Sequence, residues 1–525
     1  MNYIKLCLMS LVLLGINQTV HAQMCDVDAN GIVDRQDVSL IFQARGQSPT
    51  PSDPRDANAD GVINLFDARQ CVTQCDLPRC ETPIAPPPTN QTHVFSGFSS
   101  SIEGWQPWVT DGTPEGTFKL KQINTNGSSV MPIGDYFDFN GAHYFFASTQ
   151  SFRDAELWRS DGTSAGTTQV SNLGQSINLT IGSAGCFAGE KLLVNAFNTN
   201  TGFTQAFAFQ ANGTIEQLDE SSVNCGNSTN IDDQSTYGTL YFANFSTDIN
   251  ENAIHISDGS SVELLGSQAN PVTRPDRMIS IGSNIFYFSR TGSSHTTLMV
   301  VKSDGSDATA LKNFTGIDST RVEARDSRLQ QIVFNGKLYF NANDGISGFS
   351  LWESDGTPSG TKLVKDLDNS PDSTEIAYMR VLGNKFIFKA EGAASGIWIS
   401  DGTEAGTQKV SNILPLELVE NTFYPPIPVV MDGKYFFTAG PAGNHELWVS
   451  DGTTAGTQIV RDINIGGSSS PVSLVAQDRY ILFAAMATEE QGFELWRSDG
   501  TNAGTFLLKD ICPDPFCNGM IDFAF

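Results

Sequence analysis

A short phrase recurs at a near-constant interval along this chain, and that interval constrains the fold more than any other feature. Counting three weaker copies, its Asp or Asn falls at positions 111, 161, 212, 258, 304, 355, 401, 451 and 499, a period of 46–51 residues. A period of that size indicates stacked or radially arranged supersecondary units. The phrase, Ser-Asp-Gly-Thr-x-x-Gly-Thr, stands at Ser160–Thr167, Ser354–Thr361, Ser400–Thr407, Ser450–Thr457 and Ser498–Thr505, with a looser copy at Thr110–Thr117.

Each unit predicts short strands and no long helix. The aromatic run Lys434–Ala439 is followed by a strand at Glu446–Ser450, the turn phrase, a third strand at Thr457–Ile463 and a fourth around Ser470–Ala476. Connections this short require antiparallel neighbours. Four such strands in a unit of about 48 residues are typical of a propeller blade.

The count of units predicts a mainly β fold, an eight- or nine-bladed β-propeller of four-stranded blades, with nine favoured. The first unit lacks a strand before His93–Phe98, and the last has a surplus strand at Met520–Phe525. Pairing the two ends would close the ring and remove its open edges, and a Cys512–Cys517 bridge could pin the closing segment. An open β-solenoid is the rival prediction.

The turn phrase has a mechanical interpretation. Its Asp can accept hydrogen bonds from amides two or three residues on, its first Gly can take a positive φ, and its Thr hydroxyls can cap the returning strand. The bulky residue before it offers a surface for packing between units, with a ring of sugar-stacking aromatics as the alternative. Six tryptophans share this place: Trp108, Trp158, Trp352, Trp398, Trp448 and Trp496.

The repeated phrase resembles the ELWxxDGTxxGT repeat of exported bacterial proteins. The match covers about residues 93–511, and it is clear in six units and faint in three. This resemblance implies an architecture and no particular activity.

Two loops near the front have the spacing of EF-hand calcium loops, at residues 26–37 and 56–67. Calcium takes six to eight hard oxygen ligands, so alternating side chains can wrap the ion while a Gly at position 6 allows the bend. Plain Asp/Asn-Gly turns are the alternative. The sequence predicts two Ca²⁺ ions, bound by the side chains of Asp26, Asp28, Asn30, Asp34, Asp37, Asp56, Asn58, Asp60, Asn64 and Asp67 and by the backbone carbonyls of Ile32 and Val62.

Each loop leads into a short segment with helical spacing, which predicts a small α domain over residues 24–80. Apolar residues fall on one face at Val38, Ile41 and Phe42, and again at Ala68, Cys71 and Val72. A domain of this size has a marginal core, so calcium and disulfides would support it. Cys25 could be bridged to Cys71 or to Cys75, and the spacing leaves both open.

This front segment resembles the type I dockerin domain over about residues 24–76. The resemblance implies that the ten side chains named above are calcium ligands and that a cohesin-like protein is a possible partner. Dockerins recognise cohesins largely through loop positions 10 and 11. Those positions are Arg35-Gln36 and Leu65-Phe66 here, which departs from the usual small hydroxyl pairs.

Whole-chain properties predict a secreted protein, at the cell surface or in the periplasm if not fully extracellular. Residues 1–22 read as a signal peptide, residues 81–92 as a Pro-rich linker, and residues 93–525 as the repeat domain, without a membrane span. The net charge of −27 argues against nucleic acid. Of nine cysteines, eight remain without Cys7, which favours three or four disulfides over thiol catalysis or zinc.

The sequence leaves catalysis uncertain and favours its absence. Acidic residues outside the phrase could form a carboxylate pair, but several fall in one equivalent loop, which favours a turn role, and the histidines show no metal spacing. We therefore expect a non-catalytic binding or assembly protein whose propeller contacts a protein or a polysaccharide. The alternative is a dockerin-bearing glycoside hydrolase or polysaccharide lyase, with candidate carboxylates Asp154, Asp344, Glu391, Glu489 and Glu490.

Overall fold

The computed structural model divides the chain into two compact units, Met1–Ala85 and Pro86–Phe525. In the front unit it describes residues 25, 27, 40–41, 44–45, 47–50, 53–57, 59–64, 67 and 71. In the second unit it describes residues 92–130, 136–139, 141–150, 155–172, 177–179, 185–188, 191–198, 203–210, 214–218, 228–230, 240–244, 253–257, 262–265, 275–291, 295–306, 308–315, 330–368, 374–416, 426–477, 479–488, 490–513 and 521–522.

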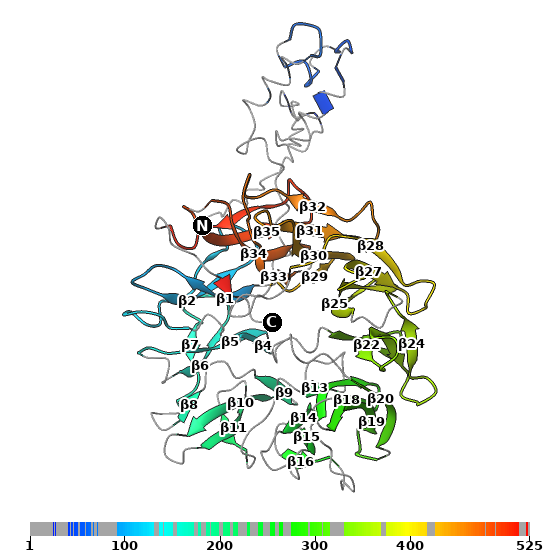
Figure 1. Cartoon of the computed structure of the whole chain (residues 1–525). Coiled ribbons are helices and arrows are strands. Elements are labelled where there is room, and N and C mark those ends of the chain that lie inside the picture. The colour runs from blue at the N-terminus through cyan, green and yellow to red at the C-terminus, as the bar shows by residue number, and fades with distance from the viewer. Residues whose placement is uncertain are drawn as a thin grey trace, which may run out of the picture. The chain divides into compact units, whose positions relative to one another are not determined.

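The second unit consists of antiparallel sheets that follow one another around a ring (Figure 1). We name the sheets A to I in chain order. Sheets A to D are formed by β1 (His93–Phe98), β2 (Trp105–Thr110), β3 (Phe118–Lys119) and β37 (Ile521–Asp522); β4 (Tyr136–Phe139), β5 (Ala142–Ala147), β6 (Glu156–Ser160) and β7 (Thr168–Gln169); β8 (Ile177–Leu179), β9 (Cys186–Ala188), β10 (Lys191–Asn198), β11 (Phe203–Gln210) and β12 (Ile215–Gln217); and β13 (Ser228–Asn230), β14 (Leu240–Asn244), β15 (Ala253–Ser257) and β16 (Val262–Leu264).

The remaining sheets each contain four consecutive strands. Sheets E to I are formed by β17 (Pro275–Ile281), β18 (Asn284–Thr291), β19 (His295–Lys302) and β20 (Thr309–Phe314); β21 (Gln331–Phe334), β22 (Lys337–Asn343), β23 (Phe349–Ser354) and β24 (Lys362–Lys365); β25 (Glu375–Leu382), β26 (Lys385–Glu391), β27 (Gly396–Ser400) and β28 (Gln408–Ser411); β29 (Val429–Met431), β30 (Lys434–Ala439), β31 (Glu446–Ser450) and β32 (Gln458–Arg461); and β33 (Val472–Ala476), β34 (Ile481–Met486), β35 (Phe493–Ser498) and β36 (Phe506–Lys509).

The two ends of the ring unit meet in sheet A, as the sequence predicts. The last strand, β37, pairs antiparallel with β1, with Ser96 opposite Asp522 and Gly97 opposite Ile521. The described residues therefore form nine sheets in a closed, propeller-like ring and not an open solenoid. One boundary is corrected: the strand around Ser470–Ala476 is β33, which begins sheet I and does not complete sheet H. Every other sheet starts with a strand of this kind, and in sheet A the last strand of the chain, β37, takes that place.

A buried arginine adds to this closure between sheets I and A. Arg497 in β35 is 4% exposed, and its Nη1 donates to the carbonyl oxygen of Gly112 at 2.6 Å. Its guanidinium lies 4.2 Å from the ring centroid of Tyr480, a distance suited to a cation–π contact. The Tyr480 hydroxyl in turn donates to the carbonyl of Asp111 at 3.3 Å. Residues far apart in sequence therefore hold the first turn phrase against the last sheet.

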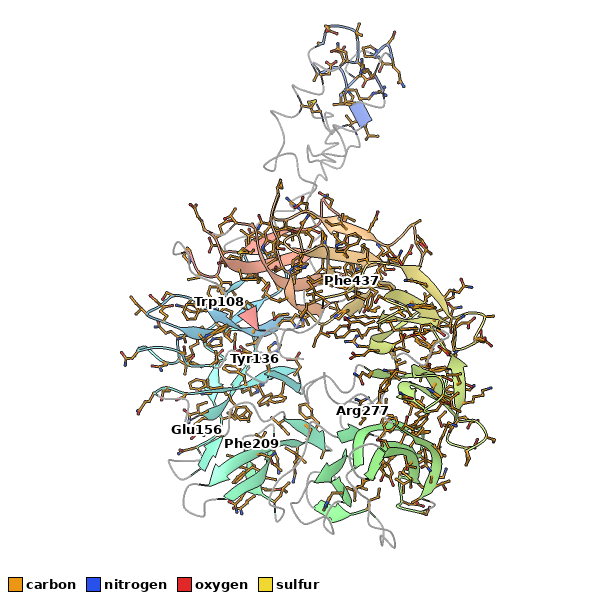
Figure 2. The ribbon with its side chains drawn as sticks, viewed as in Figure 1. Trp108, Tyr136, Glu156, Phe209, Arg277 and Phe437 are labelled. Atoms are coloured by element: carbon orange, nitrogen blue, oxygen red, sulfur yellow. A yellow bond between two sulfur atoms is a disulfide. The ribbon has the colours of Figure 1, made fainter. Side chains whose placement is uncertain are left out.

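Apolar side chains fill the junctions between consecutive sheets. Eight clusters of buried residues each join one sheet to the next, and Trp108, Phe209 and Phe437 belong to three of them (Figure 2). Five of the six repeated tryptophans are buried, and Trp448 is half-buried. Packing between sheets therefore accounts for their position, and they are not arranged as an exposed platform for sugars.

The Asp of the turn phrase organises its own loop. In sheet G, Asp401 Oδ1 accepts hydrogen bonds from the N–H and the hydroxyl of Thr403, at 2.9 and 2.7 Å. The same hydroxyl oxygen accepts the N–H of Gly406 at 2.9 Å. A Cβ on Gly406 would collide with the carboxylate of Asp401, so the second Gly of the phrase is required by close approach. The same contacts recur at Asp111, Asp161, Asp355, Asp451 and Asp499.

The first Gly of the phrase meets two separate requirements. Gly402 has a φ of +90°, a region that side-chain-bearing residues rarely adopt. A Cβ at this residue would also lie 3.0 Å from Cζ of Tyr339 in the preceding sheet. Phe436 covers Gly500 in the same way, with its Cζ 2.9 Å from the position of a Cβ. The phrase is therefore at once a hairpin turn and a contact between sheets.

Acid should weaken the ring through these turns. The hydroxyls of Thr163 and Thr403 lower the pKa of Asp161 and of Asp401, respectively. In the unfolded chain an Asp titrates near pH 3.9, so the lowered pKa adds stability above that value and the gain is lost as pH falls through the folded pKa. We expect the melting temperature to drop between about pH 5 and about pH 2. Asp401→Asn, which does not titrate, should reduce this dependence, and an unchanged acid profile would contradict the assignment.

The front unit has a small core closed by a disulfide. Cys25 and Cys71 are bonded with their Cα atoms 5.4 Å apart, which settles one pairing that the sequence leaves open. Helical geometry is described only at Leu40–Ile41, Asp67 and Cys71, so the predicted pair of helices is not seen in the described part of this unit. Across the residues given above, no helix is long and apolar enough to cross a membrane. The buried core comprises Cys25, Ile41, Ala44, Ala57, Ile63 and Cys71.

Candidate calcium site and the acidic residues of the ring

The second predicted calcium loop bends around the carboxylate of Asp56. Its Oδ1 accepts the N–H of Asp60 and its Oδ2 accepts the N–H of Gly61, both at 3.1 Å. Gly61 has a φ of +85°, and no described atom lies within 4 Å of where a Cβ would be. Its role is therefore conformational, as position 6 of an EF-hand loop requires.

Further contacts link the remaining predicted ligands of this loop. Asp60 Oδ1 accepts the N–H of Val62 at 2.9 Å, and Asn64 Nδ2 donates to the Val62 carbonyl at 2.9 Å. Asp67 Oδ2 accepts the N–H of Asn64 at 2.8 Å. Asp67 is fully buried and Asp56 is 9% exposed, whereas Val62 is 51% exposed. Two carboxylates are thus held inside a loop in which Asp60 and Val62 are exposed.

These oxygens fit calcium by their chemistry. The described ligand positions offer only carboxylate, amide and carbonyl oxygens, the donors that Ca²⁺ prefers. No group of three or more His, Cys, Asp or Glu side chains is gathered for a metal within the described ranges. That result does not count the Asn and backbone oxygens on which an EF-hand loop also depends. Asp26, Asp28, Asn30, Ile32, Asp34, Asp37 and Asn58 lie outside the described residues.

An ion pair supports the segment that leads into this loop. The guanidinium of Arg55 contacts Asp53 Oδ2 at 2.8 Å, and its hydrogen bond lowers the pKa of Asp53 to about 2. The Asp53 side chain is 4% exposed. The carbonyl of Pro54 accepts the N–H of Cys25 at 3.1 Å. The disulfide and the segment of residues 53–55 therefore hold the start of the second loop close to Cys25.

The carboxylates considered as a catalytic pair have structural contacts where they are described. Asp344 Oδ1 accepts the N–H groups of Ile346 and Ser347, both at 2.9 Å, which is the turn role that the sequence favours. Glu391 lies 3.1 Å from the ammonium of Lys389. Glu490 is exposed, and Asp154 and Glu489 lie outside the described residues. The described candidates do not form a carboxylate pair in a cavity.

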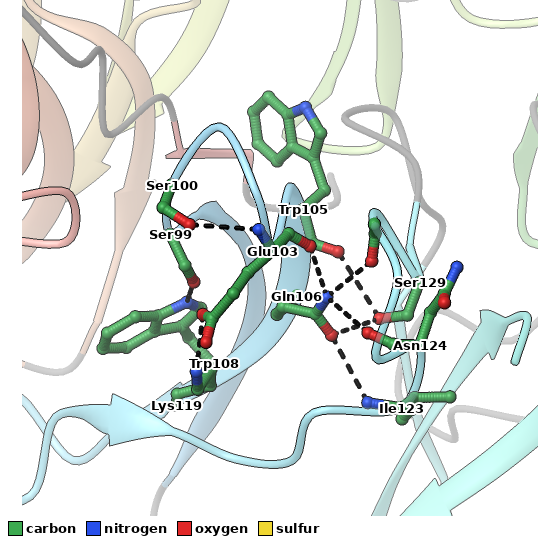
Figure 3. A network of polar contacts seen from close by, with 11 residues as sticks. Ser99, Ser100, Glu103, Trp105, Gln106, Trp108, Lys119, Ile123, Asn124 and Ser129 are labelled. Carbon is green, nitrogen blue, oxygen red and sulfur yellow. Dashed lines mark hydrogen bonds and ion pairs between the residues drawn. The ribbon is translucent and has the colours of Figure 1, made fainter.

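A second set of polar residues, which was not predicted from the sequence, lies two positions before the tryptophans. In sheet A this position is Gln106, which is fully buried. Its Nε2 donates to the carbonyls of Glu103 and Gly127 at 2.7 and 2.9 Å, and its Oε1 accepts the Ser129 hydroxyl at 2.7 Å (Figure 3). The side chain therefore holds the loop that leads from sheet A to sheet B.

Glutamates take the same place in other sheets. Glu446 is 1% exposed and accepts the N–H groups of Ile463 and Ser469 at 3.0 and 2.9 Å. Glu494 is 2% exposed and accepts the N–H of Ile511 at 2.5 Å. The recurring Glu-Leu-Trp triplet is the signal that could have revealed these residues. Their carboxylates hold backbone between sheets, so they are not available as acids or bases.

Comparisons with known proteins identify no relative by sequence. No family model matches the chain, and no curated protein matches it. Among solved structures, a puromycin-hydrolysing peptidase of Mycobacterium tuberculosis is 11% identical with a TM-score of 0.37, over 63% of this chain and 53% of that one. This chain therefore spans about half of that peptidase.

Two further solved structures are similarly distant. The β-propeller domain of the trilobed protease from Pyrococcus furiosus is 12% identical with a TM-score of 0.32, over 63% of this chain and 98% of that one. An oligogalacturonate lyase in complex with manganese is 12% identical with a TM-score of 0.36, over 70% of this chain and 86% of that one. At these values the likenesses carry no argument about activity or substrate.

Proposed function

We propose that this is an exported calcium-binding protein in which a dockerin-like front unit attaches a propeller-like ring to a partner. The ring would be a non-catalytic platform for a protein or a polysaccharide. The observation that carries the proposal is the second loop, in which Asp56 accepts two backbone N–H groups and Asp67 is fully buried. A buried carboxylate is costly unless donors or a cation balance its charge, and the loop's other oxygens suit a hard divalent ion.

Disulfides support the exported location. Cys25 is bonded to Cys71, and Cys186 and Cys512 are also in disulfides. Such bonds persist in oxidising compartments and are rare in the cytosol. The composition of residues 1–22 is consistent with a signal peptide that directs the chain there.

The non-catalytic part of the proposal rests on the acidic residues of the ring. The described carboxylates at the turn phrases, at Asp344 and at Glu446 accept backbone N–H groups. A carboxylate that is bound to backbone in this way builds the scaffold and is not positioned to protonate a glycosidic oxygen. The surface of such a scaffold is left for recognition, and a cohesin-like protein or a polysaccharide is the partner class that we propose.

Calcium titration of the mature chain by calorimetry tests the proposal. We expect two sites, one lost in Asp26→Ala, one in Asp56→Ala and both in the double variant. In the full chain, calcium should also stabilise the front unit and not the ring. At a hundredfold excess over Kd the gain in stability is about 2.7 kcal/mol, which should raise the melting temperature of the front unit. Asp344→Asn, which alters an acidic turn of the ring, should leave both sites intact. Absence of binding heat at about 1 mM calcium, the weak end for extracellular modules, would refute the proposal.

A further inference from the structure

A hydrogen-bonded series of three side chains lies where sheet A meets sheet B. Thr92 directly precedes β1, whereas Asp138 and His143 face each other across the β4–β5 hairpin. The Thr92 Oγ1 atom is 2.9 Å from Nε2 of His143, and the other ring nitrogen, Nδ1, is 2.5 Å from Oδ1 of Asp138. The hairpin register brings the carboxylate to the imidazole, and the preceding sheet supplies the hydroxyl.

The chemistry of the three groups fixes the direction of these hydrogen bonds. An ionised carboxylate only accepts hydrogen bonds, so Nδ1 of His143 carries the proton shared with Asp138. In the neutral imidazole Nε2 then has a free lone pair and accepts the hydroxyl proton of Thr92. A hydroxyl, a base and a group that orients the base, each within hydrogen-bond distance of the next, form the arrangement that activates a nucleophile.

This junction differs from two others of the ring in the side chain that covers the turn glycine. A Cβ on the turn glycine Gly162 would lie 3.1 Å from Oγ1 of Thr92. At the equivalent glycines of sheets G and I, the preceding sheet presents an aromatic ring, from Tyr339 and Phe436. At this junction the small side chain of Thr92 therefore takes the place of the larger Tyr339 and Phe436 side chains. His143 is largely buried, at 13% side-chain exposure, whereas Asp138 is exposed at 67%. Thr92 is half-buried, so the hydroxyl that reacts is only partly covered.

We propose that Thr92, His143 and Asp138 form a nucleophilic site that accepts an acyl group from an activated ester. The Oγ1 of Thr92 attacks the carbonyl carbon while its proton moves to Nε2 of His143. The bond from the carbonyl carbon to the leaving oxygen breaks, and that oxygen takes the proton from Nε2. The products are an acyl-threonine and an alcohol.

The neighbouring backbone amides favour neither formation nor hydrolysis of the acyl-threonine. The N–H of Gly162 donates to Ser160 Oγ at 3.0 Å, and the N–H of Thr163 donates to Asp161 at 2.9 Å. Those neighbouring amides are committed to the turn and do not stabilise a developing oxyanion, which is often the largest contribution to acyl transfer. Both formation and hydrolysis of the acyl-threonine are therefore slow. Because the alkoxide of Thr92 is a poorer leaving group than that of an activated ester, hydrolysis is the slower of the two, and we expect the adduct to accumulate.

Mass spectrometry of the full chain after incubation with p-nitrophenyl acetate tests this proposal. We expect one acetyl group on the peptide that contains Thr92, none in Thr92→Ala, and retention in Thr92→Ser. His143→Asn should slow the acetylation by about a hundredfold, the lower end of general-base catalysis, and Asp138→Asn should slow it less. His445→Asn, a histidine outside the group, should have no effect.

Two results would overturn the proposal. One is a wild-type Thr92 peptide that remains unmodified while lysines elsewhere react. The other is His143→Asn that is acetylated at the wild-type rate. Thermal unfolding of each variant, followed by circular dichroism, separates loss of reactivity from loss of fold. A variant that melts like the wild type and is not acetylated supports the proposal.

Discussion

Gly402→Ala should destabilise the ring by about 2–5 kcal/mol, because it combines a left-handed backbone at about 1–2 kcal/mol with overpacking at about 1–3 kcal/mol. Gly402 has a φ of +90°, and its added Cβ would approach the ring of Tyr339 in the preceding sheet. The free energy of unfolding from denaturant titration measures the loss. If the ring unfolds in more than one step, the transition that involves sheets F and G should move.

Two matched glycines separate the cost of the backbone conformation from the cost of the contact with the preceding sheet. Gly433 has a φ of +66° and no described atom within 4 Å of where a Cβ would lie, so Gly433→Ala should cost only the backbone term of about 1–2 kcal/mol. Gly406 has no positive φ, but its Cβ would displace the carboxylate of Asp401 and break two hydrogen bonds. Equal losses in Gly402→Ala and Gly433→Ala would mean that contact with the preceding sheet contributes nothing.

Trp352→Ala should cost about 3–5 kcal/mol, the usual range for removing a buried large aromatic. Trp352 is 3% exposed and packs edge-on against Phe314 of sheet E, with their ring centroids 5.2 Å apart. The Nζ of Lys312 lies 4.9 Å from the centroid of the same indole. Removing the ring opens a cavity between sheets E and F. Calorimetric unfolding of the ring measures the loss.

The indole nitrogen gives a matched comparison for this residue. Trp158 Nε1 donates to the carbonyl of Ala147 at 3.1 Å, whereas Trp352 Nε1 has no hydrogen-bond partner among the described residues. Trp158→Phe should therefore lose about 0.5–1.5 kcal/mol more than Trp352→Phe, the net value of a hydrogen bond. If Trp352→Ala left stability unchanged and instead weakened binding of a polysaccharide, the tryptophans would be a recognition surface and the packing interpretation would be wrong.

Much of the ring could be predicted because its unit is repeated. Asp401, Gly402 and Gly406 act within eight residues of chain, so their spacing alone predicts the hairpin. The closure by β37 followed from counting strands, since one unit lacked a strand that the other end had in surplus. The strand β33 was assigned to the wrong sheet. The repeat period of the sequence shows how far apart the units are, but it does not show at which strand each sheet begins.

The site was less predictable, because its contacts join distant or weakly patterned residues. Asp56 and Gly61 belong to one local motif, and the hydrogen bond between them lies within the predicted loop. The Cys25–Cys71 bond could be assigned only from the structure, because in the sequence Cys75 was an equally good partner for Cys25. His143 showed no metal or catalytic spacing in sequence, because its partner Thr92 is 51 residues away, directly before the first strand of a different sheet. Only the ring geometry brings that pair together.

Hydrogen–deuterium exchange of the full chain and of a chain that lacks residues 520–525 tests the closed ring most directly. The β37–β1 pairing at Ser96 and Gly97 predicts slow exchange of β1 amides in the full chain, faster exchange after truncation and a lower melting temperature of the ring. Identical exchange in β1 and identical melting of the two chains would show that the last strand does not close the ring, and the account of the fold would be contradicted.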